Sequence, residues 1–518
     1  MMNFGKKILL LGLPLTLILS NCTDLEDNVV GKPVDNTETG SCSAAKGNAS
    51  EALGSAYARL NDFSDQSNAY AMEEHPSDEM MGPTRGTDWD DFGTWRKLHQ
   101  HTWDSQHNQI IAAWDNLNNG VYRSLQSIYF ATPAQTQIKA EATFLKAFYS
   151  FYIVDLYGQL PSTDLANTCD GAKISSRSQA VDTLVKDLNY AVANLSSGSA
   201  GKATKEAAEF LLAKVYLNKA VYKQDPQSPA GPYTFDKADM DKVIELCNAI
   251  IASGKYELTA KGKYFDNFHW ENGTRSKELI FTVENNEGSP IANARNRYYM
   301  GLHYNQIPSG WNGFTTLGDF YNSFEATDER VGGTYPGVTD KIGLNVGFLV
   351  GQQYDKDGKK LKTRGGEDLI FTPDINLSAA GEEKGIRVVK YVPEPGNLDN
   401  GGHDYVFFRY ADVLLMKAEA LLRGGTDPNG ETAASLVNTL RTTRGASTLG
   451  TVDLAAVLAE RGRELYYEGW RRNDQIRFEK FLTPVDQRPA QSDAHVVVFP
   501  LPQKVVDTNP TWSQNFGY

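Results

Sequence analysis

Tryptophans that stand among carboxylates and glycines are the residues of this sequence best suited to chemistry. Residues 87–103, TDWDDFGTWRKLHQHTW, contain Trp89 and Trp95 beside Asp90 and Asp91, in a stretch that glycine breaks into loop. A flat indole ring matches the apolar face of a sugar, and neighbouring carboxylates accept hydrogen bonds from its hydroxyl groups. We therefore predict a glycan-binding loop here. The alternative is that one or more of these tryptophans anchors the loop to the scaffold.

A second segment of the same character lies much further along the chain. Residues 304–316, YNQIPSGWNGFTT, contain Tyr304, Trp311 and Asn312, and an asparagine side chain is both a donor and an acceptor. Because the two tryptophan segments share this setting, we hypothesise that they border one shallow binding surface. Two further acidic residues, in loops after the first helix, are secondary candidates: Asp65 and Asp78.

Support for catalysis or metal binding is weaker. The sequence has no GxSxG nucleophile elbow, no HExxH zinc motif and no phosphate-binding GxxxxGK[ST] loop. His99, His101 and His107 could be metal ligands, but ordinary packing and hydrogen bonding are the favoured interpretation. Residues 354–358, YDKDG, begin like a calcium loop but lack the acidic residue needed at its end. We expect no enzyme activity and no cofactor, with a glycosidase carboxylate pair within 88–91 as a minor alternative.

The first residues of the chain indicate its cellular location. Residues 1–21 contain two lysines followed by an apolar run over 8–19, which is typical of a secretory signal peptide and too short for a confident membrane span. The run ends in LSNC, which resembles a bacterial lipobox in which Cys22 is acylated. Residues 22–42 are then expected to form a flexible, lipid-anchored tether. The alternative is ordinary signal cleavage beside an incidental cysteine.

Composition bounds the class of protein. Hydrophobic residues make up 41% and charged residues 22%, so a packed core is expected. Lys and Arg number 51 against 64 Asp and Glu, a net charge of −13, which argues against nucleic-acid binding. The spacings of the four cysteines fit no zinc or redox motif. Cys42 and Cys169 could pair in an oxidising compartment, and the sequence leaves this open.

Helical periodicity dominates both ends of the chain and fades in its middle. Paired helices with interleaved small and aromatic positions resemble tetratricopeptide repeats. Residues 260–405 contain many glycines, and we expect irregular, loop-rich structure there with a hairpin turn at Asp357-Gly358. Charged residues of the C-terminal helices predict an ion-pair network between packed helices. Apolar spacing predicts helices over 134–157, 178–195, 204–216, 240–251, 410–423, 432–444 and 454–478.

Four long segments together resemble the SusD/RagB family of outer-membrane nutrient-binding lipoproteins. They are FLKAFYSFYIVDLYGQLP at 144–161, FRYADVLLMKAEALLR at 408–423, ERGRELYYEGWRRNDQIRFEKF at 460–481 and the ending VVFPLPQKVVDTNPTWSQNFGY. They occur in the order that the family shows, and with the lipobox the resemblance spans nearly all of the mature chain.

The resemblance implies a fold and an organisation. It implies a mainly α fold, in which a tetratricopeptide-like helical scaffold carries a large irregular, loop-rich insertion. The expected parts are an N-terminal helical part at 43–259, an irregular ligand-binding region at 260–405 and a C-terminal helical part at 406–518. All of 43–518 is expected to form one compact unit.

The resemblance also implies a function. Family members capture a nutrient, usually an oligosaccharide, at the cell surface and deliver it to a SusC-type TonB-dependent outer-membrane transporter. Their ligand site resembles an aromatic arc built from an early loop and the middle region, and 88–95 and 304–314 match these sources by order. The alternatives are a peptide-binding member of the family and, less favoured, a surface glycosidase.

Overall fold

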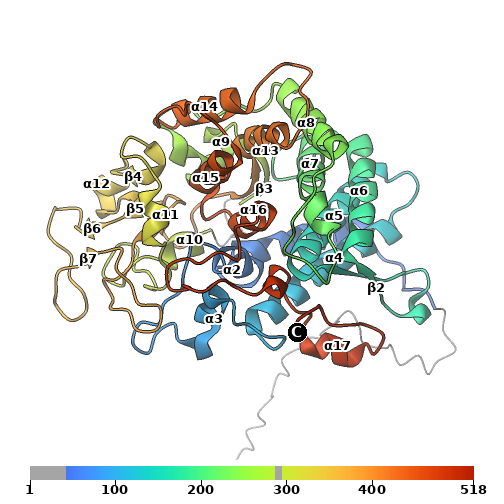
Figure 1. Cartoon of the computed structure of the whole chain (residues 1–518), viewed down its shortest axis with the longest axis horizontal. Coiled ribbons are helices and arrows are strands. Elements are labelled where there is room, and N and C mark those ends of the chain that lie inside the picture. Colours follow the sequence, from blue (N-terminus) through green and yellow to red (C-terminus); the bar gives the residue numbers. More distant parts are fainter. Residues whose placement is uncertain (1–41, 286–293) are drawn as a thin grey trace, which may run out of the picture.

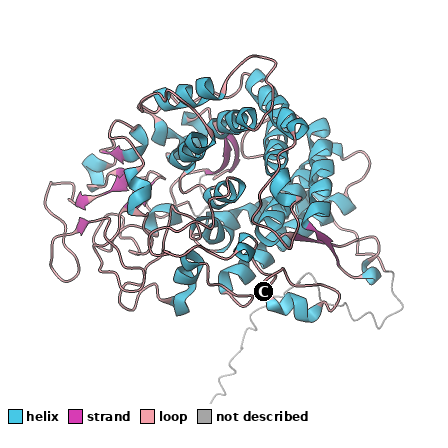
Figure 2. Ribbon diagram, viewed as in Figure 1, coloured by secondary structure: helices cyan, strands magenta, loops and turns pink. Residues whose placement is uncertain are grey.

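Helices build both ends of the chain, and short strands and loops fill its middle, in the computed structural model (Figures 1 and 2). The structure describes residues 42–285 and 294–518, so the predicted signal peptide and Cys22 lie outside the described residues. The predicted mainly helical class is confirmed. The N-terminal helices are α1 (Ala49–Ala58), α2 (Asn68–Glu74), α3 (Thr94–Gln100), α4 (Asn108–Phe130), α5 (Thr136–Tyr157), α6 (Arg177–Asn194), α7 (Lys205–Tyr222) and α8 (Lys237–Ala252).

The N-terminal scaffold is a row of helices in which each of α4 to α8 packs on the next. Helix α5 is buried over most of its length because aromatic and aliphatic residues occupy all of its faces. The start of α6 corrects the helix predicted over 178–195, because the helix begins at Arg177 with Ser176 as its N-cap. Ser176 and Gln179 form a capping box, which satisfies two backbone donors at once. None of the described helices is long and apolar enough to cross a bilayer.

The middle region leaves the scaffold at strand β3 and returns at strand β9. These two strands pair antiparallel, with Leu279 opposite Arg409 and Val283 opposite Tyr405, so the intervening chain is closed at its base. The strands are β1 (Gln159–Ser162), β2 (Lys173–Ser176), β3 (Leu279–Val283), β4 (Gly332–Gly333), β5 (Val346–Leu349), β6 (Gly351–Gln352), β7 (Ile370–Phe371), β8 (Arg387–Val389) and β9 (Tyr405–Arg409). The short helices of the middle region are α9 (Asn272–Arg275), α10 (Asn296–Tyr299), α11 (Gly318–Asn322) and α12 (Thr339–Ile342).

Small sheets organise the excursion between β3 and β9. Strand β5 pairs with β4 and β8, and β6 pairs with β7. The predicted hairpin turn is confirmed: Asp355 N–H donates to Lys359 O at 2.9 Å, and Gly358 takes the left-handed conformation with φ 76°. Glycine adopts that conformation without steric cost, which explains its place in the turn.

The C-terminal helices pack against the row of N-terminal helices. Helix α13 packs on α7 and α8, and α14 and α15 pack on α13. The continuous helix predicted over 454–478 is wrong, because the chain breaks at 466–470, where Tyr467 and Gly469 have positive φ. These helices are α13 (Tyr410–Leu422), α14 (Ala433–Thr443), α15 (Leu454–Leu465), α16 (Arg471–Arg477) and α17 (Gln503–Thr508).

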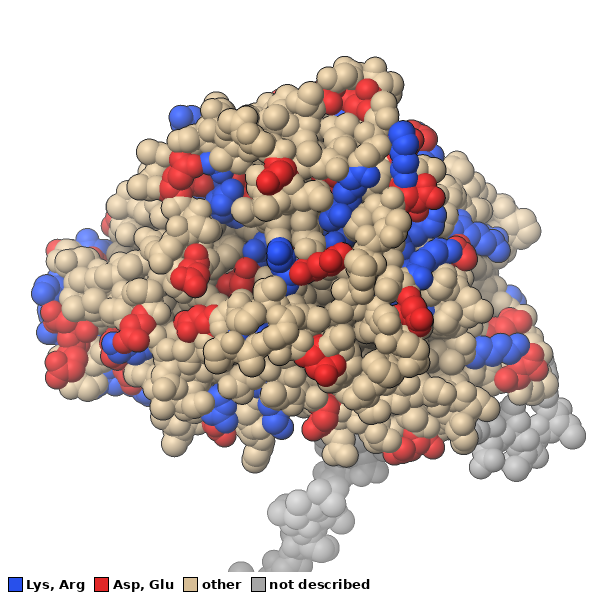
Figure 3. All heavy atoms as spheres, viewed as in Figure 1, with Lys and Arg blue, Asp and Glu red and all other residues tan. Residues whose placement is uncertain are grey.

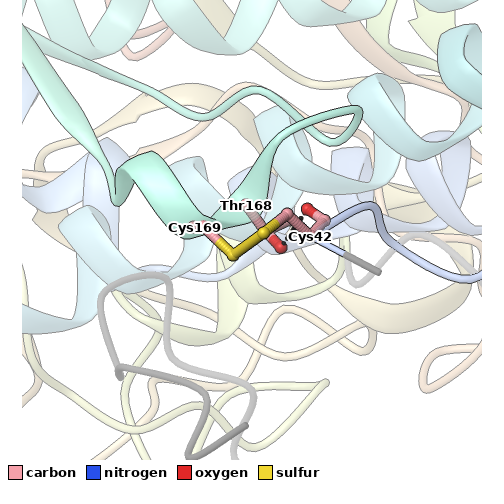
Figure 4. The surroundings of a disulfide bond; sticks show 3 residues. All are labelled: Cys42, Thr168 and Cys169. Carbon is pink, nitrogen blue, oxygen red and sulfur yellow. Dashed lines mark hydrogen bonds between the residues drawn. A yellow bond between two sulfur atoms is a disulfide. The ribbon is translucent and has the colours of Figure 1, made fainter. Parts of the chain in front are cut away.

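A disulfide fixes the chain where the described part begins. Cys42 and Cys169 are bonded, with 5.3 Å between their Cα atoms, which settles the pairing that the sequence left open. Thr168 reinforces it, since its backbone N–H and its hydroxyl both donate to Cys42 O (Figure 4). The bond closes a long loop, which in the chain-entropy view stabilises the fold by restricting the unfolded state.

Buried ion pairs join the C-terminal helices to one another, as the charged residues of these helices predicted, and they also join these helices to the middle region. The Glu464 carboxylate on α15 is fully buried and binds Arg330 at 2.9 Å, Arg409 at 2.5 Å and Arg444 at 2.9 Å. Burial alone would raise the pKa of Glu464, but these three arginines hold it well below its usual range. Glu278, which the sequence did not single out, binds Arg409 and Arg444 as well.

Replacing Glu464 by glutamine should destabilise the protein by about 3–5 kcal/mol, because three buried guanidinium groups lose their shared anion. Its depressed pKa means that the stabilisation is present above the unfolded value of about pH 4.5 and is lost as pH falls further. Thermal melts should therefore show a shallower acid loss in the variant than in the parent. Glu245→Gln is the control, since its surface pair with Lys242 contributes about 0–1 kcal/mol. Equal melting of the two variants at neutral pH would contradict the assigned role of Glu464.

Candidate ligand-binding site

The two tryptophan segments meet in the structure. Trp89 Nε1 donates to the backbone oxygen of Trp311 at 2.9 Å, across 222 positions of sequence. Gly313 makes this contact possible, because a Cβ atom there would lie 2.5 Å from Trp89 Cε2. Trp89 and Trp311 are each half-buried, so each keeps part of its ring at the surface.

Trp95 lies beneath Trp89, and its predicted exposure is corrected. It is 5% exposed on α3, with its ring 4.8 Å from Phe314, 5.2 Å from His75 and 5.8 Å from Trp89. Its Nε1 donates to Asp91 Oδ2 at 2.6 Å. The anchoring alternative therefore describes Trp95, because the ring supports the loop from below.

The loop that carries Trp89 holds an unusual backbone. Trp89, Asp91 and Phe92 have φ values of 61°, 39° and 55°, a region that bulky residues rarely adopt. The Phe92 side chain is 97% exposed. Arg96 pairs with Asp90 at 2.9 Å and helps to hold this shape. Strained backbone of this kind concentrates at functional sites, and Phe92 is a residue that the sequence analysis did not select.

A second aromatic ring stands next to Trp311. The Tyr299 ring on α10 lies 5.7 Å from the Trp311 ring, and its hydroxyl donates to Asp399 Oδ1 at 2.9 Å. Arg295 contacts the same oxygen at 3.1 Å. Tyr299, Asp399 and Arg295 were missed from sequence because no local pattern connects them with Trp311.

Tyr304 binds the other tryptophan segment through Asp88. The Tyr304 hydroxyl donates to Asp88 Oδ2 at 2.5 Å, and the Arg364 guanidinium lies 4.0 Å from the Tyr304 ring centre. Arg364 also pairs with Glu382. Burial alone would raise the pKa of Glu382, but hydrogen bonds from Arg364 and His303 lower it. The site therefore has a cation beside a ring, with the carboxyl groups of Asp88 and Glu382 next to it.

The remaining predicted residues have protein partners. Asn312 is fully buried with φ 52°, and its Oδ1 accepts from Arg387 at 2.8 Å, so it shapes the turn and faces inward, which corrects its expected place on the surface. Asp65 accepts from Ser67 N–H at 2.9 Å. Asp78 forms two hydrogen bonds with Arg471, at 2.6 and 2.8 Å.

Five aromatic rings form the candidate site, which we call the aromatic surface: Trp89, Phe92, Tyr299, Tyr304 and Trp311.

The structure offers no support for the metal alternative. In residues 42–285 and 294–518, no group of three or more His, Cys, Asp and Glu side chains could hold a metal ion. His99, His101 and His107 each contact a backbone oxygen instead, those of Asp486, Pro76 and Thr94. On the face drawn in Figure 3, acidic and basic side chains are interspersed, with no continuous basic area of the kind that nucleic acid requires.

Comparison with known proteins extends this description over most of the chain. A family model described as "SusD family" matches residues 277–491, and one described as "Starch-binding associating with outer membrane" matches residues 46–217. The starch-binding protein SusD of Bacteroides thetaiotaomicron is 25% identical over 75% of this chain and 74% of its own length.

Solved structures share the fold. A SusD superfamily protein of Parabacteroides distasonis superposes with a TM-score of 0.69 at 18% identity, over 91% of this chain and 98% of that one. Surface glycan-binding protein A of Bacteroides thetaiotaomicron, solved in complex with laminarihexaose, superposes with a TM-score of 0.65 at 19% identity, over 90% and 98% of the two chains. The two family models match separate parts of one continuous fold, and over both parts the chain resembles proteins of the SusD family.

Proposed function

We propose that this protein binds a glycan at the cell surface, on the aromatic surface around Trp89 and Trp311. The observation that carries the proposal is that two segments distant in sequence meet through a hydrogen bond from the Trp89 indole to the Trp311 backbone, and that each segment carries a half-buried indole ring. Aromatic rings stack on sugars, and the carboxylates of Asp88 and Asp399 accept hydrogen bonds from hydroxyl groups. One relative is named for starch binding, and one solved relative holds a laminarihexaose.

We further propose that the protein is a lipid-anchored component of an outer-membrane uptake system. The "associating with outer membrane" description of the matching family model supports the location. A lipid on Cys22 would supply the anchor, and the polar residues up to Cys42 would let the folded part reach a partner. The expected partner is a SusC-type TonB-dependent transporter, to which the bound oligosaccharide is delivered.

Binding without catalysis fits the acids of this surface better than hydrolysis. A glycosidase needs one protonated carboxylic acid, with a raised pKa, beside a second carboxylate. Here the pKa of Glu382 is lowered, and Asp88 is held by Tyr304 and Arg364. Asp90 pairs with Arg96 in the same way. The relatives support binding too, since their names describe glycan binding.

Trp311→Ala should weaken oligosaccharide binding by about 1–3 kcal/mol, on the order of tenfold to a hundredfold, because one stacking ring is lost. Phe92→Ala should weaken binding without changing the melting temperature, since its side chain is 97% exposed. Isothermal titration with malto- and laminari-oligosaccharides, beside thermal melts, measures both effects.

Trp95→Ala is the matched structural control for that experiment. Because Trp95 is 5% exposed, its loss should cost about 3–5 kcal/mol of stability and reduce binding only as a consequence. Unchanged sugar affinity in both Trp311→Ala and Phe92→Ala would place the site elsewhere. Binding of short peptides in place of every sugar would favour the peptide-binding alternative.

Cys22→Ala should release the protein from the membrane fraction, because Cys22 supplies the thiol for acylation at the predicted signal boundary. Fractionation of the producing cells, followed by immunoblotting, measures the shift. Cys247→Ala is the control, since that thiol is buried in the core and should not affect membrane association. A Cys22→Ala protein that stays in the membrane fraction would overturn the lipid anchor.

A further inference from the structure

A second concave site lies apart from the aromatic surface. It is a cleft of about 520 Å³ between the 3₁₀ helix η4 (Tyr264–Phe268), helix α9 and the chain from 329 to 341. Figure 1 draws its far wall, β4 and α12, well away from α3, which carries the tryptophan loop. This volume is that of a small-molecule site, and no residue of the aromatic surface lines it.

Aromatic rings form part of the cleft wall. The His269 and Trp270 rings stack with 3.6 Å between their centres, and Trp270 remains half-exposed. The Tyr335 ring also lines the cleft, and its hydroxyl donates to Asp266 Oδ1 at 3.0 Å. A half-exposed indole that a second ring holds in place is a ready stacking platform for a flat apolar face.

Three glycines leave part of the facing wall without side chains. Gly332, Gly333 and Gly337 line the cleft with φ values of 85°, 141° and 83°, which residues with side chains rarely adopt. At Gly332 a Cβ atom would lie 2.1 Å from the backbone oxygen of Val346, so glycine is required there. The absence of side chains at these three positions leaves room for a ligand in the cleft.

Two lysines of the cleft are available to pair with an anion. Lys263, Lys341 and Arg275 line it against Asp266 and Glu329. Within the described parts of the chain neither lysine has an ion-pair partner, whereas Arg275 pairs with Glu271 at 2.8 Å, outside the cleft lining.

His269 does not alter that balance. Burial lowers the pKa of its ring to about 3, so the ring is neutral at physiological pH. Lys263 and Lys341 are thus two exposed cations without ion-pair partners in the described residues, in a chain of net charge −13.

We propose that this cleft binds an acidic saccharide unit, with a uronate or sulfated sugar ring stacked on Trp270 and its anionic group paired with Lys263 and Lys341. The proposal goes beyond glycan binding at the aromatic surface, because it assigns a separate site with a different ligand charge. It also stands independently, since the cleft shares no residue with that surface.

The test uses the full mature chain carrying Trp311→Ala, so that the aromatic surface contributes little. The probes are oligogalacturonate, alginate oligosaccharide and chondroitin sulfate oligosaccharide, with maltotetraose as the neutral comparison, in isothermal titration. We expect at least one anionic probe to bind more tightly than maltotetraose and to lose affinity as salt is added. Lys263→Gln with Lys341→Gln should weaken that binding at least tenfold, and Trp270→Ala by a similar factor.

Controls separate the cleft from general charge and from folding. Lys277→Gln removes an exposed lysine outside the cleft, which pairs with Glu257, and should leave the affinity unchanged. The two exposed lysines test the proposal even if Trp270→Ala lowers the melting temperature. The proposal is overturned if no anionic probe binds, if maltotetraose binds as tightly, or if the double lysine variant binds like the Lys277→Gln protein. If the aromatic surface proves not to bind sugar, these outcomes still test the cleft, because every assay uses the Trp311→Ala protein.

Discussion

The carboxylate of Glu464 is the contact on which the rest of the arrangement depends. Its three arginines come from three segments: Arg330 from the middle region, Arg409 from the end of β9 and Arg444 from the end of α14. A buried charge is costly unless it is fully paired, so this anion is stable only when all three segments have arrived. The same residue also contacts the cleft, since the Tyr264 hydroxyl donates to the Glu464 backbone oxygen at 2.9 Å and its partner Arg330 follows Glu329 in the chain. Helix packing and one wall of the cleft therefore meet at Glu464.

The aromatic surface depends on buried arginines of another kind. Arg85 donates to Gly313 O at 3.2 Å and Arg387 donates to Asn312 Oδ1 at 2.8 Å, and no carboxylate in the described residues forms an ion pair with either. A guanidinium group has five donors in a fixed plane, which suits it to holding several backbone oxygens of an irregular turn. The turn that presents Trp311 is thus held from beneath while its ring stays at the surface. A site that is rigid before it binds loses less entropy when the ligand arrives.

How much of this structure the sequence could predict depends on whether each feature is set by neighbouring residues or by contacts between distant segments. Helical periodicity is local, so the long helices were predictable. On the apolar face of α13, Leu414, Leu415 and Ala418 are buried as that pattern indicates, whereas Tyr410 and Leu422 are half-buried. The apolar periodicity continues through residues 466–470, so the pattern missed the helix break there although Gly469 was visible. The helix ends because Glu468 turns to pair with Lys390 and Arg409. The two tryptophan segments were found by composition. Which ring would be buried was not predictable, since Trp95 is covered by Phe314 from the other segment. Tyr299, Arg364 and Asp399 act only through distant partners and carry no local pattern.

A protein that hands its ligand to a transporter must hold it and also release it, and the proposed function sets a physical limit on the site. Each aromatic stacking contact contributes on the order of 1–3 kcal/mol, so a few rings around Trp311 hold a sugar chain weakly and let it dissociate quickly. An enclosed pocket of the same length would slow release, whereas an open surface lets a neighbouring protein take the ligand ring by ring. A charged cleft on another wall would add affinity for chains that carry acidic units, because two weak contacts on one chain bind together more tightly than either alone. Stacking at the aromatic surface would then capture the glycan weakly, and ion pairing in the cleft would select chains that carry acidic units.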